Sequence, residues 1–527
     1  MKLYKKIPFA DIEEIPDLIR DFLNSDIPYA EDHLFSPANL KAKIAAKSAH
    51  FTLANREVLC EVLQEQNAQS DSPLQHNHLN LLRENTTFTV TTGHQLNLFT
   101  GPVFFIYKIL QTIKTATYLK SQFSEYNFVP VFWMATEDHD LEEISFFNTE
   151  NQRYYLSATS GGAVGRIVLE DVSFIDAFAQ EFKDTVFGTE LILMMKEAYT
   201  PGNTLAEATR TLVNRLFAEF GLLIIDGDDS RLKKMMIPAF RDELINSEIL
   251  KSTNSRVEFL TARYGKVQVN PREVNLFYLT ESRNRIDKEG EKFVLADSDR
   301  AFTQDEIIGE LMSHPERFSP NALMRPVYQE SVLPNIAYIG GNAEIMYWLE
   351  LTGYFHDKNL PFPILIPRNS FLNISSKTLS KMSRHSLEIS DFFGDYNAVI
   401  NSKILQNNEI LELLNAKEKE VAAAFKSIRE LAAGTEKSFG NLVAAEETRQ
   451  LKSYKRMSRR LLRAEKVKQY ERVTALQNLF LKVHPGGKWQ ERVYNFSVYY
   501  AFEGNSWLKS CLEEMDVHTS SLVVMVD

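Results

Sequence analysis

The sequence is poor in cysteine: Cys60 and Cys511 are the only two among its 527 residues. Because no Cys-x-x-Cys pair occurs, a disulfide framework and a thiolate zinc site are both excluded, and we assign no metal-ligating residue. The sequence also lacks a run of about eighteen apolar residues, so no transmembrane helix is expected. Its N-terminus carries acids and prolines, which excludes a signal peptide. These absences predict a cytoplasmic protein.

The sequence has no excess of positive charge either. It contains 59 Lys and Arg against 70 Asp and Glu, a formal net charge of −11, which argues against a chain-wide surface for polyanions. Basic residues do gather between Arg449 and Arg472. We interpret them as the solvated, partner-facing side of a helix, with nucleic-acid binding as the alternative. We therefore predict neither a nucleic acid nor a membrane as partner.

The most informative stretch is residues 86–120, TTFTVTTGHQLNLFTGPVFFIYKILQTIKTATYLK. Apolar residues alternating with threonines predict a strand, which Gly93 interrupts; His94 and Gln95 follow directly. Apolar residues at helical spacing then predict a long helix. Ligands of an open parallel sheet bind beyond the carboxyl ends of its strands. We therefore expect His94 and Gln95 to lie in a pocket.

A helix cap is predicted just before this long helix. Thr100 is the candidate N-cap residue, and Pro102 falls in the first helical turn. The free N–H groups of that turn would face the same pocket, where an anion could dock. Thr100 and Gly101 are therefore candidate binding residues, and a purely structural role in the cap is the alternative.

A second strand end carries a cluster of charged residues. Residues 128–135, FVPVFWMA, form a nearly unbroken apolar run, typical of a strand buried on both faces. The residues that follow are Glu137, Asp138, His139 and Asp140. We expect the two strand ends to line one cleft. Three chemical roles stay open for the cluster, namely amine binding, general-base action and Mg2+ binding, and a solvated loop is the structural alternative.

Further strands and two insertions complete the predicted core of residues 1–395. The chain is too long for one ordinary core, so two or three domains are expected. Residues 1–85 indicate mainly helices, and the insertions are expected at about 150–220 and 255–325. Strands are predicted at 153–159, 165–170, 221–229, 266–279, 292–296 and 361–366.

Long helices follow the core. Apolar residues at steps of seven, four and three predict an antiparallel coiled-coil hairpin over residues 396–483, with arms of about 50 Å each. Gly434 and Gly440 are the candidate turn positions. Residues 484–527 are expected to pack back on the core. The stripe of the hairpin comprises Leu414, Val421, Phe425, Ile428, Leu451, Tyr454 and Leu461.

Five segments together resemble one known family, the cysteine ligases of bacillithiol synthesis. They are TGHQLNLFTGP, FWMATEDHDLEEI, YIGGNAEIMYWLEL at 338–351, PRNSFLNI at 367–374 and QERVYN at 490–495, and they span about three quarters of the chain. Such enzymes are similar to class I aminoacyl-tRNA synthetases. The resemblance implies an α/β fold, with a Rossmann-like parallel sheet, inserted connecting segments and an antiparallel helical coiled-coil arm.

The resemblance also implies an activity, the addition of L-cysteine to the amine of glucosaminyl-malate. It makes His94, Glu137, Asp138 and His139 the candidate catalytic residues. The candidate substrate-binding residues are Gln95, Thr100, Gly101, Asp140, Glu344, Tyr347, Trp348, Arg368 and Asn369. Arg368 and Asn369 follow a strand end and suit the malyl carboxylates, because arginine binds carboxylate bidentately. Lys488 and Arg492 are candidates for a phosphate site.

Several questions stay open at this level. ATP and Mg2+ are compatible with the reaction but not required by any motif, and a homodimer through the coiled coil is expected from the resemblance. One alternative function is a class I synthetase-like nucleotidyl or acyl transferase acting on another amine. The other is a non-catalytic coiled-coil interaction protein, for which the residues at the strand ends would be dispensable.

Overall fold

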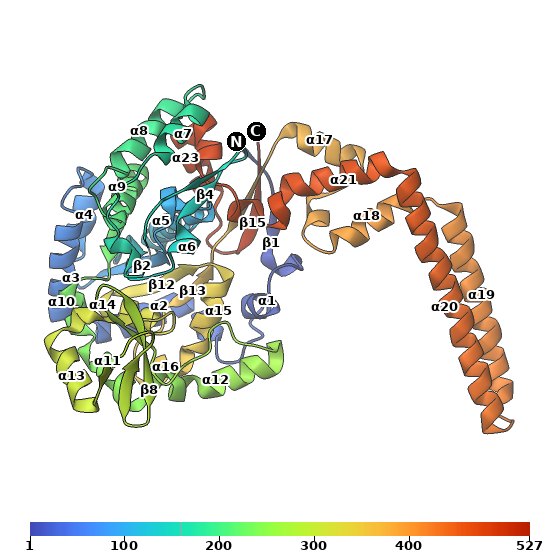
Figure 1. Cartoon of the computed structure of the whole chain (residues 1–527), viewed down its shortest axis with the longest axis horizontal. Helices are drawn as coiled ribbons and strands as arrows, with labels where there is room; N and C mark the ends of the chain where they lie inside the picture. Colours follow the sequence, from blue (N-terminus) through green and yellow to red (C-terminus); the bar gives the residue numbers. More distant parts are fainter. Residues whose placement is uncertain (160) are drawn as a thin grey trace. The chain divides into compact units, whose positions relative to one another are not determined.

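The structure is a computed structural model that describes residues 1–159 and 161–527. It divides into two compact units (Figure 1): a core unit of Met1–Asn373 with Trp489–Asp527, and a helical unit of Ile374–Lys488. This division differs from the sequence-based one at residues 374–395, which lie in the helical unit rather than the core. No helix in the described ranges is long and apolar enough to span a membrane.

A five-stranded parallel sheet forms the centre of the core unit. Its spatial order is β13-β12-β2-β3-β6, and every neighbouring pair is parallel. In chain order this is the doubly wound arrangement of a Rossmann-like fold, whose topological switch point lies between β2 and β12. The fold class predicted from the sequence is therefore confirmed. The strands are β2 (Thr87–His94), β3 (Asn127–Met134), β6 (Leu223–Asp226), β12 (Asn335–Gly340) and β13 (Ile364–Pro367).

The first strand and its helix differ in detail from the prediction. Gly93 does not end β2, because it pairs with Trp133 and the strand continues to His94. Thr100 is not an N-cap residue: it lies in the short helix η3 (Leu98–Thr100), and α5 (Phe104–Gln122) begins later. The reason is the left-handed backbone of Phe99, Thr100 and Gly101, with φ of 46°, 68° and 61°.

The first insertion lies between β3 and β6. The predicted strand at 165–170 is wrong, because this segment forms the turn η4 (Val164–Arg166) and then a single bridge from Val168 to Thr204. A strand needs a partner along its length, and this segment is paired only around Val168, with residues 202–205. The other elements are α6 (Leu141–Ile144), β4 (Phe146–Asn148), β5 (Arg153–Tyr155), α7 (Phe174–Phe182), α8 (Gly188–Ala198), α9 (Leu205–Phe217) and η5 (Ala218–Phe220).

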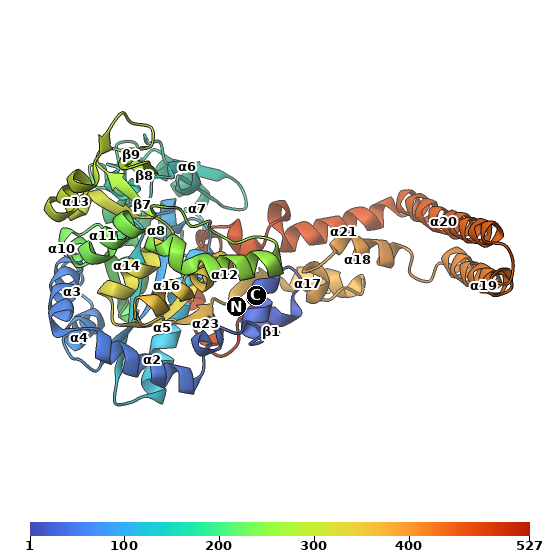
Figure 2. The same ribbon diagram turned by 90° about the horizontal axis from the view of Figure 1, so that it is seen from below.

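The second insertion, between β6 and β12, carries an antiparallel sheet of order β10-β9-β8-β7-β11. In Figure 2 this sheet lies on the same side of the core unit as α6. Its strands are β7 (Leu276–Leu279), β8 (Arg283–Glu289), β9 (Lys292–Leu295), β10 (Ala301–Phe302) and β11 (Phe318–Pro320). Its helices are α10 (Ser230–Met235), α11 (Ile237–Asn246), α12 (Glu248–Tyr264), α13 (Gln304–Ser313), η6 (Pro315–Arg317) and α14 (Met324–Val332).

A third sheet joins the two ends of the chain. Strand β15 (Ser521–Val526) lies between β1 (Lys2–Pro8) and β14 (Ser370–Ile374). Helices α15 (Asn342–Glu350) and α16 (Thr352–Asp357) connect β12 to β13. The remaining elements of the core unit are η1 (Phe9–Asp11), α1 (Asp17–Leu23), η2 (Glu31–His33), α2 (Pro37–His50), α3 (Leu53–Gln66), α4 (Pro73–Leu81), η9 (Gln490–Arg492), α22 (Ser497–Glu503) and α23 (Asn505–Glu514).

The helical unit contains the predicted hairpin. Its arms are α19 (Glu409–Ala432) and α20 (Lys437–Lys468), with 24 and 32 residues, hence about 36 and 48 Å long at 1.5 Å per residue. Gly434 lies in the turn, whereas Gly440 lies inside α20. The unit also contains α17 (Ser376–Arg384), η7 (Ile389–Phe392), α18 (Tyr396–Ile404), α21 (Tyr470–Val483) and η8 (Pro485–Gly487).

Candidate functional site

A cavity of about 520 Å3 opens at the carboxyl edge of the central sheet. Its floor is the end of β2 and β3, its walls include the first turns of α14 and α15, and strands of the second insertion contribute its remaining side. This is the switch point of the sheet, where ligands of doubly wound folds bind. Its size is in the range of small-molecule sites.

Gln95 and Asp138 meet in this cavity, as the sequence predicted. The Gln95 amide Nε2 donates to Asp138 Oδ2 at 2.7 Å and to Glu143 Oε2 at 3.1 Å. The backbone N–H of His139 donates to the other Asp138 oxygen at 2.8 Å. The Asp138 carboxylate is thus fixed in orientation while it still lines the cavity.

His94 lies at the same edge, packed against the rings of Phe104 and Phe105. Burial, together with the positive charge of Lys108, lowers the pKa of His94 to about 3. Its imidazole is therefore neutral at physiological pH. A neutral imidazole with so low a pKa is a hydrogen-bonding group rather than an efficient proton acceptor.

Glu137 is engaged in a buried ion pair beside the cavity. Lys233, which is fully buried, donates to Glu137 and also to the carbonyl oxygen of Phe318 at 2.5 Å. Burial raises the pKa of Glu137, while Lys233 opposes this shift. Because Phe318 belongs to β11, the pair ties the end of the central sheet to the second insertion.

A second ion pair joins α5 to α15. Lys108 Nζ donates to both Glu344 oxygens, at 2.7 and 2.9 Å, and to the carbonyl oxygen of Gly93. The Tyr338 hydroxyl donates to Glu344 Oε2 at 2.5 Å. Burial alone would raise the pKa of Glu344, but Lys108, Tyr338 and Arg325 lower it to about 2. Glu344 is therefore ionised, and both of its oxygens accept hydrogen bonds from neighbouring residues.

Arg325 lies in the first turn of α14 and faces the cavity. Its guanidinium donates to the Tyr347 hydroxyl at 2.7 Å, to the Tyr338 hydroxyl at 3.3 Å and to Gln329 Oε1 at 3.2 Å. All three acceptors are neutral groups. Tyr347, which the sequence assigned to the pocket wall, also lines the cavity.

The second insertion contributes Arg283 from β8. Its guanidinium lies 3.9 Å from the centre of the Phe277 ring and donates to the Ser319 hydroxyl and the Pro320 carbonyl. It also lies 3.6 Å from Asp138 and 2.9 Å from His139 Nδ1. The His139 side chain is 44% exposed and lies outside the cavity lining. His139 therefore borders the site from outside, next to Arg283, Asp138 and Phe277.

Four predicted residues support the site without lining it. Asp140 caps α6 through the backbone N–H of Glu143. Trp348 is fully buried against Tyr338. Thr100 and Gly101 belong to the left-handed turn, where an added Cβ at Gly101 would lie 2.6 Å from Asn97 Cβ. Each of these four residues contributes to the fold beside the main cavity, and its predicted role in substrate binding stays a prediction.

Arg368 and Asn369 lie in a separate cluster. Arg368 forms a bidentate ion pair with Glu491, at 3.0 and 2.7 Å, in which both side chains are buried. The Asn369 amide binds the Thr519 carbonyl and the backbone N–H of Asp516. Arg492 lines a cavity of about 220 Å3 with Arg368. Lys488, its predicted partner in a phosphate site, is an exposed residue at the end of the helical unit.

Sequence reasoning missed three cations of the main cavity, Lys108, Arg283 and Arg325. Lys108 had a signal, since it is a single charge within the apolar first half of α5. The sequence around Arg325 and Arg283 carries no such signal, because each side chain reaches the cavity only when the second insertion has folded. A site assembled from distant segments is not encoded in local spacing.

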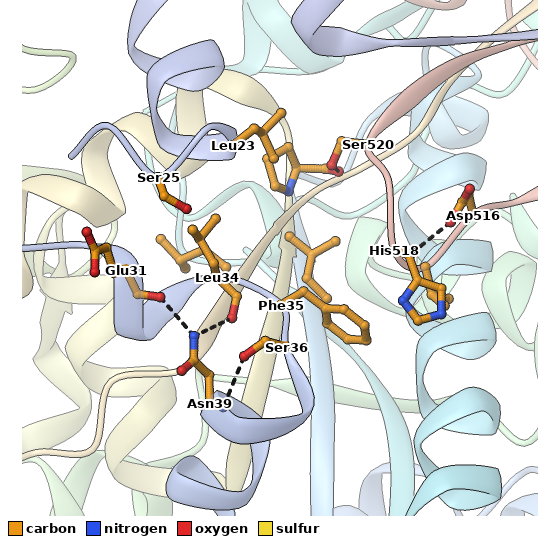
Figure 3. Close-up of a pocket in the computed structure, with 14 residues that line it drawn as sticks. Leu23, Ser25, Glu31, Leu34, Phe35, Ser36, Asn39, Asp516, His518 and Ser520 are labelled. Atoms are coloured by element: carbon orange, nitrogen blue, oxygen red, sulfur yellow. Dashed lines mark hydrogen bonds between the residues drawn. The ribbon is translucent and has the colours of Figure 1, made fainter. Parts of the chain in front are cut away.

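Another cavity, of about 400 Å3, lies between the N-terminal helices and the C-terminal loop (Figure 3). Its polar groups bind one another: Asn39 donates to the carbonyl oxygens of Glu31 and Leu34, and Ser36 accepts from the Asn39 backbone. His518 packs against Phe35. None of the predicted site residues lines this cavity among the described residues, so we assign no activity to it.

The fold and the main cavity define the class of the protein: a Rossmann-like α/β protein with a small-molecule cavity at the edge of its parallel sheet and a helical coiled-coil unit. The N-terminal Rossmann-like domain of bacillithiol biosynthesis BshC matches residues 5–369, and the C-terminal coiled-coil domain of the same family matches residues 371–525. The chain belongs to this family, and its role lies in bacillithiol biosynthesis.

Individual relatives agree with this assignment. A protein of Flavobacterium johnsoniae, named "Putative cysteine ligase BshC", is 39% identical over 94% of this chain and 95% of its own. One from Christiangramia forsetii with the same name is 35% identical over 98% of each chain. A solved structure described as a putative arginyl-tRNA synthetase from Campylobacter jejuni covers 84% of this chain and 98% of its own, with 8% identity. Its TM-score of 0.21 is too low to support an argument.

Proposed function

We propose that this protein joins the carboxyl group of L-cysteine to the amine of glucosaminyl-malate, forming an amide bond. One observation carries the proposal: the cavity at the switch point unites three of the family-like segments, through Gln95, Asp138 and Glu344, and presents both an anion and cations. An amine needs the anion, whereas malyl carboxylates need the cations.

Asp138 is the residue that we propose for the amine. It lines the cavity, and Gln95 and its own loop hold its carboxylate in place. An amine becomes a nucleophile only after it loses a proton, and a carboxylate at hydrogen-bond distance can accept that proton. His139 is less suited to this role because it lies outside the cavity lining, beside Arg283.

His94 and Glu137 are proposed as positioning residues. Neutral His94 offers a hydrogen bond next to the reacting groups without a charge of its own. Glu137 and Lys233 hold the second insertion against the sheet, which keeps Arg283 and Phe277 over the cavity. Orientation of reactants of this kind is a large part of enzymatic catalysis.

Amide formation from a carboxylate and an amine requires an activated donor. We propose ATP with Mg2+ as the activating cosubstrate. The cysteine carboxylate would attack the α-phosphorus and displace pyrophosphate. The sugar amine would then attack the acyl carbon of this acyl-adenylate, lose a proton and displace AMP. Arg492, which lines a cavity with Arg368 near the start of α15, remains the candidate for phosphate binding.

We also propose a homodimer formed through the hairpin. Only Ala432 and Val443 of its two long arms are buried. Large apolar side chains such as Leu413, Leu431 and Leu442 are more than half exposed. A second copy would cover such a surface. In sedimentation equilibrium we expect twice 60.5 kDa; a monomer at micromolar concentration would refute the dimer, and deletion of residues 409–468 should produce monomers.

The reaction is tested with purified protein, L-cysteine, glucosaminyl-malate, ATP and Mg2+, followed by mass spectrometry. We expect the amide product, together with AMP and pyrophosphate. Separate omission of ATP, Mg2+ and each substrate identifies what the reaction needs. Absence of the amide in the complete mixture would refute the reaction, and amide formation without ATP would refute only the activation step.

A further inference from the structure

Arg325 differs from every other cation at the main cavity in the charge of its partners. Lys108 is paired with Glu344, Lys233 with Glu137, and Arg283 lies beside Asp138. The three acceptors of Arg325 are two tyrosine hydroxyls and an amide oxygen. Within residues 1–159 and 161–527, no carboxylate forms an ion pair with it.

Arg325 is therefore a cation of the cavity wall that has no ion-pair partner of its own among the described residues. A guanidinium in a partly buried wall is stabilised by neutral acceptors, but an anion stabilises it further because the charge–charge attraction is strong there. Because the planar guanidinium of Arg325 has a fixed orientation, it favours a planar anion. Tyr347 and Tyr338 hold one guanidinium nitrogen and Gln329 holds the other, so the planar group faces the cavity already ordered.

We propose that Arg325 binds a carboxylate of the malyl group and thereby selects glucosaminyl-malate over other amino sugars. This inference rests on the proposed function. The charges match in kind, since the substrate has two carboxylates and one ammonium group, and the cavity offers Arg325 to an anion and Asp138 to a cation. Planar carboxylate and planar guanidinium also match in shape.

The same reasoning removes Arg368 as the malate-binding residue. Both terminal nitrogens of Arg368 already bind Glu491, at 3.0 and 2.7 Å, and the pair is buried. A malyl carboxylate could bind both terminal nitrogens of Arg368 only by displacing Glu491. Arg325 requires no such exchange, because its acceptors are neutral.

The test compares two amines that differ only in the malyl group, glucosaminyl-malate and methyl glucosaminide. For Arg325→Gln we expect kcat/KM for glucosaminyl-malate to fall about 100-fold, mainly through KM, since an unpaired recognition group costs that much discrimination. The value for methyl glucosaminide should change less than about threefold. Arg325→Lys should show an intermediate preference for glucosaminyl-malate over methyl glucosaminide, because lysine keeps the positive charge but cannot bind a carboxylate with two parallel hydrogen bonds.

Arg285→Gln provides the matched control. Arg285 belongs to the same strand as Arg283 but pairs with Asp287 and does not line the cavity. We expect no change in preference for this variant. An equal loss on both amines in Arg325→Gln, or no loss on either, would overturn the inference.

A binding measurement separates this inference from the proposed reaction. Calorimetric titration with glucosaminyl-malate should show at least about tenfold weaker binding to Arg325→Gln than to the unmodified protein. If no product forms but this difference is found, the reaction is wrong and the carboxylate site stands. Equal affinity of the two proteins would refute the site, and so would failure of the unmodified protein to bind glucosaminyl-malate.

Discussion

Two charged clusters of the core unit follow strand ends, and they differ in how their charges are used. At the main cavity, Asp138 and Arg325 face open space and hold part of their bonding capacity free for a ligand. At the ends of β13 and β14, Arg368 and Glu491 satisfy each other and are buried. Both clusters include residues of the sequence segments that resemble the cysteine ligase family.

The comparison teaches that position at a strand end is not sufficient for a binding role. Glu491 accepts hydrogen bonds from Arg368, from the Ser370 hydroxyl and from the backbone N–H of Phe371. It joins the C-terminal segment to β14 and leaves little capacity for a ligand. The free capacity of a charged group, rather than its presence, separates the functional cluster from the structural one.

The largest effect is expected for Asp138→Asn. Asparagine keeps the size of the side chain and one of its two acceptor oxygens, but it cannot accept the proton of the amine. We expect product formation to fall about 100- to 10,000-fold, the usual contribution of an acid–base group, with an unchanged melting temperature. Steady-state product formation by mass spectrometry and thermal unfolding measure the two quantities.

Asp140→Asn is the matched control for this variant. Asp140 lies two residues away but caps α6 outside the cavity, and asparagine also caps helices well. Its activity should be close to that of the unmodified protein. Full turnover by Asp138→Asn would reassign the whole loop to a structural role.

For Glu491→Gln we expect the opposite result, a loss of stability with unchanged binding of the substrate. Removing one partner of a buried ion pair leaves Arg368 unpaired and should lower the free energy of unfolding by about 3–5 kcal/mol. The affinity of the folded variant for glucosaminyl-malate should stay within about threefold, because Arg368 and Glu491 do not line the main cavity. Urea unfolding gives the first quantity, and calorimetric titration below the transition gives the second.

Glu65→Gln is the control for this loss of charge. Glu65 pairs with Arg231 at the surface, where the loss of one partner should hardly change the free energy of unfolding because water screens the pair. A folded Glu491→Gln protein that no longer binds glucosaminyl-malate would show that its cluster belongs to the substrate site.

A pH-dependent effect is expected at Glu350, behind the cavity wall. Its carboxylate accepts the backbone N–H groups of Gln268 and of Val269, which lines the cavity. Burial raises its pKa to about 7, against an ordinary value of 4.5. The folded protein therefore binds a proton more tightly than the unfolded chain, and stability should fall as the pH rises from 4.5 to about 7.

Glu350→Gln removes this penalty while it keeps an acceptor for the two N–H groups. Relative to the unmodified protein, the variant should gain up to about 3 kcal/mol of stability between pH 4.5 and pH 8, at 1.36 kcal/mol per pKa unit. Thermal unfolding at both pH values measures the gain. A difference in melting temperature that is the same at both values would contradict the assigned cause.

The smallest effect is expected for Gly93→Ala. An added Cβ would lie 3.3 Å from Arg325 Nη1 and 3.6 Å from the Tyr338 hydroxyl. The guanidinium must then shift by a few tenths of an ångström, and we expect the affinity for glucosaminyl-malate to fall about three- to tenfold. Isothermal titration is the measurement, and an unchanged affinity would show that the exact place of Arg325 is unimportant.

The sequence predicted the main architecture because local patterns encode it. An unbroken apolar run indicates the buried strand β3, and the alternation of apolar residues with threonines indicates β2. Heptad spacing indicates the paired helices α19 and α20. The meeting of Gln95 with Asp138 followed from a general property of parallel sheets. These inferences needed no knowledge of distant contacts.

Other features could not be predicted because they depend on such contacts. Asn495 fixes the left-handed turn at residues 99–101, because its side-chain amide donates to the carbonyl oxygens of Phe99 and Gly101. This turn makes α5 begin later in the chain than the sequence predicted. Arg283 and Arg325 reach the cavity only after the second insertion has folded. Arg368 suited a malate-binding role until Glu491, more than a hundred residues later, was found to occupy it.

The central claim is that the switch-point cavity binds glucosaminyl-malate between Asp138 and Arg325. A crystal structure of the complex tests this most directly. The account predicts the sugar amine within about 3 Å of an Asp138 oxygen and a malyl carboxylate at the same distance from Arg325. A ligand bound instead to Arg368 and Arg492, with the main cavity empty, would contradict it.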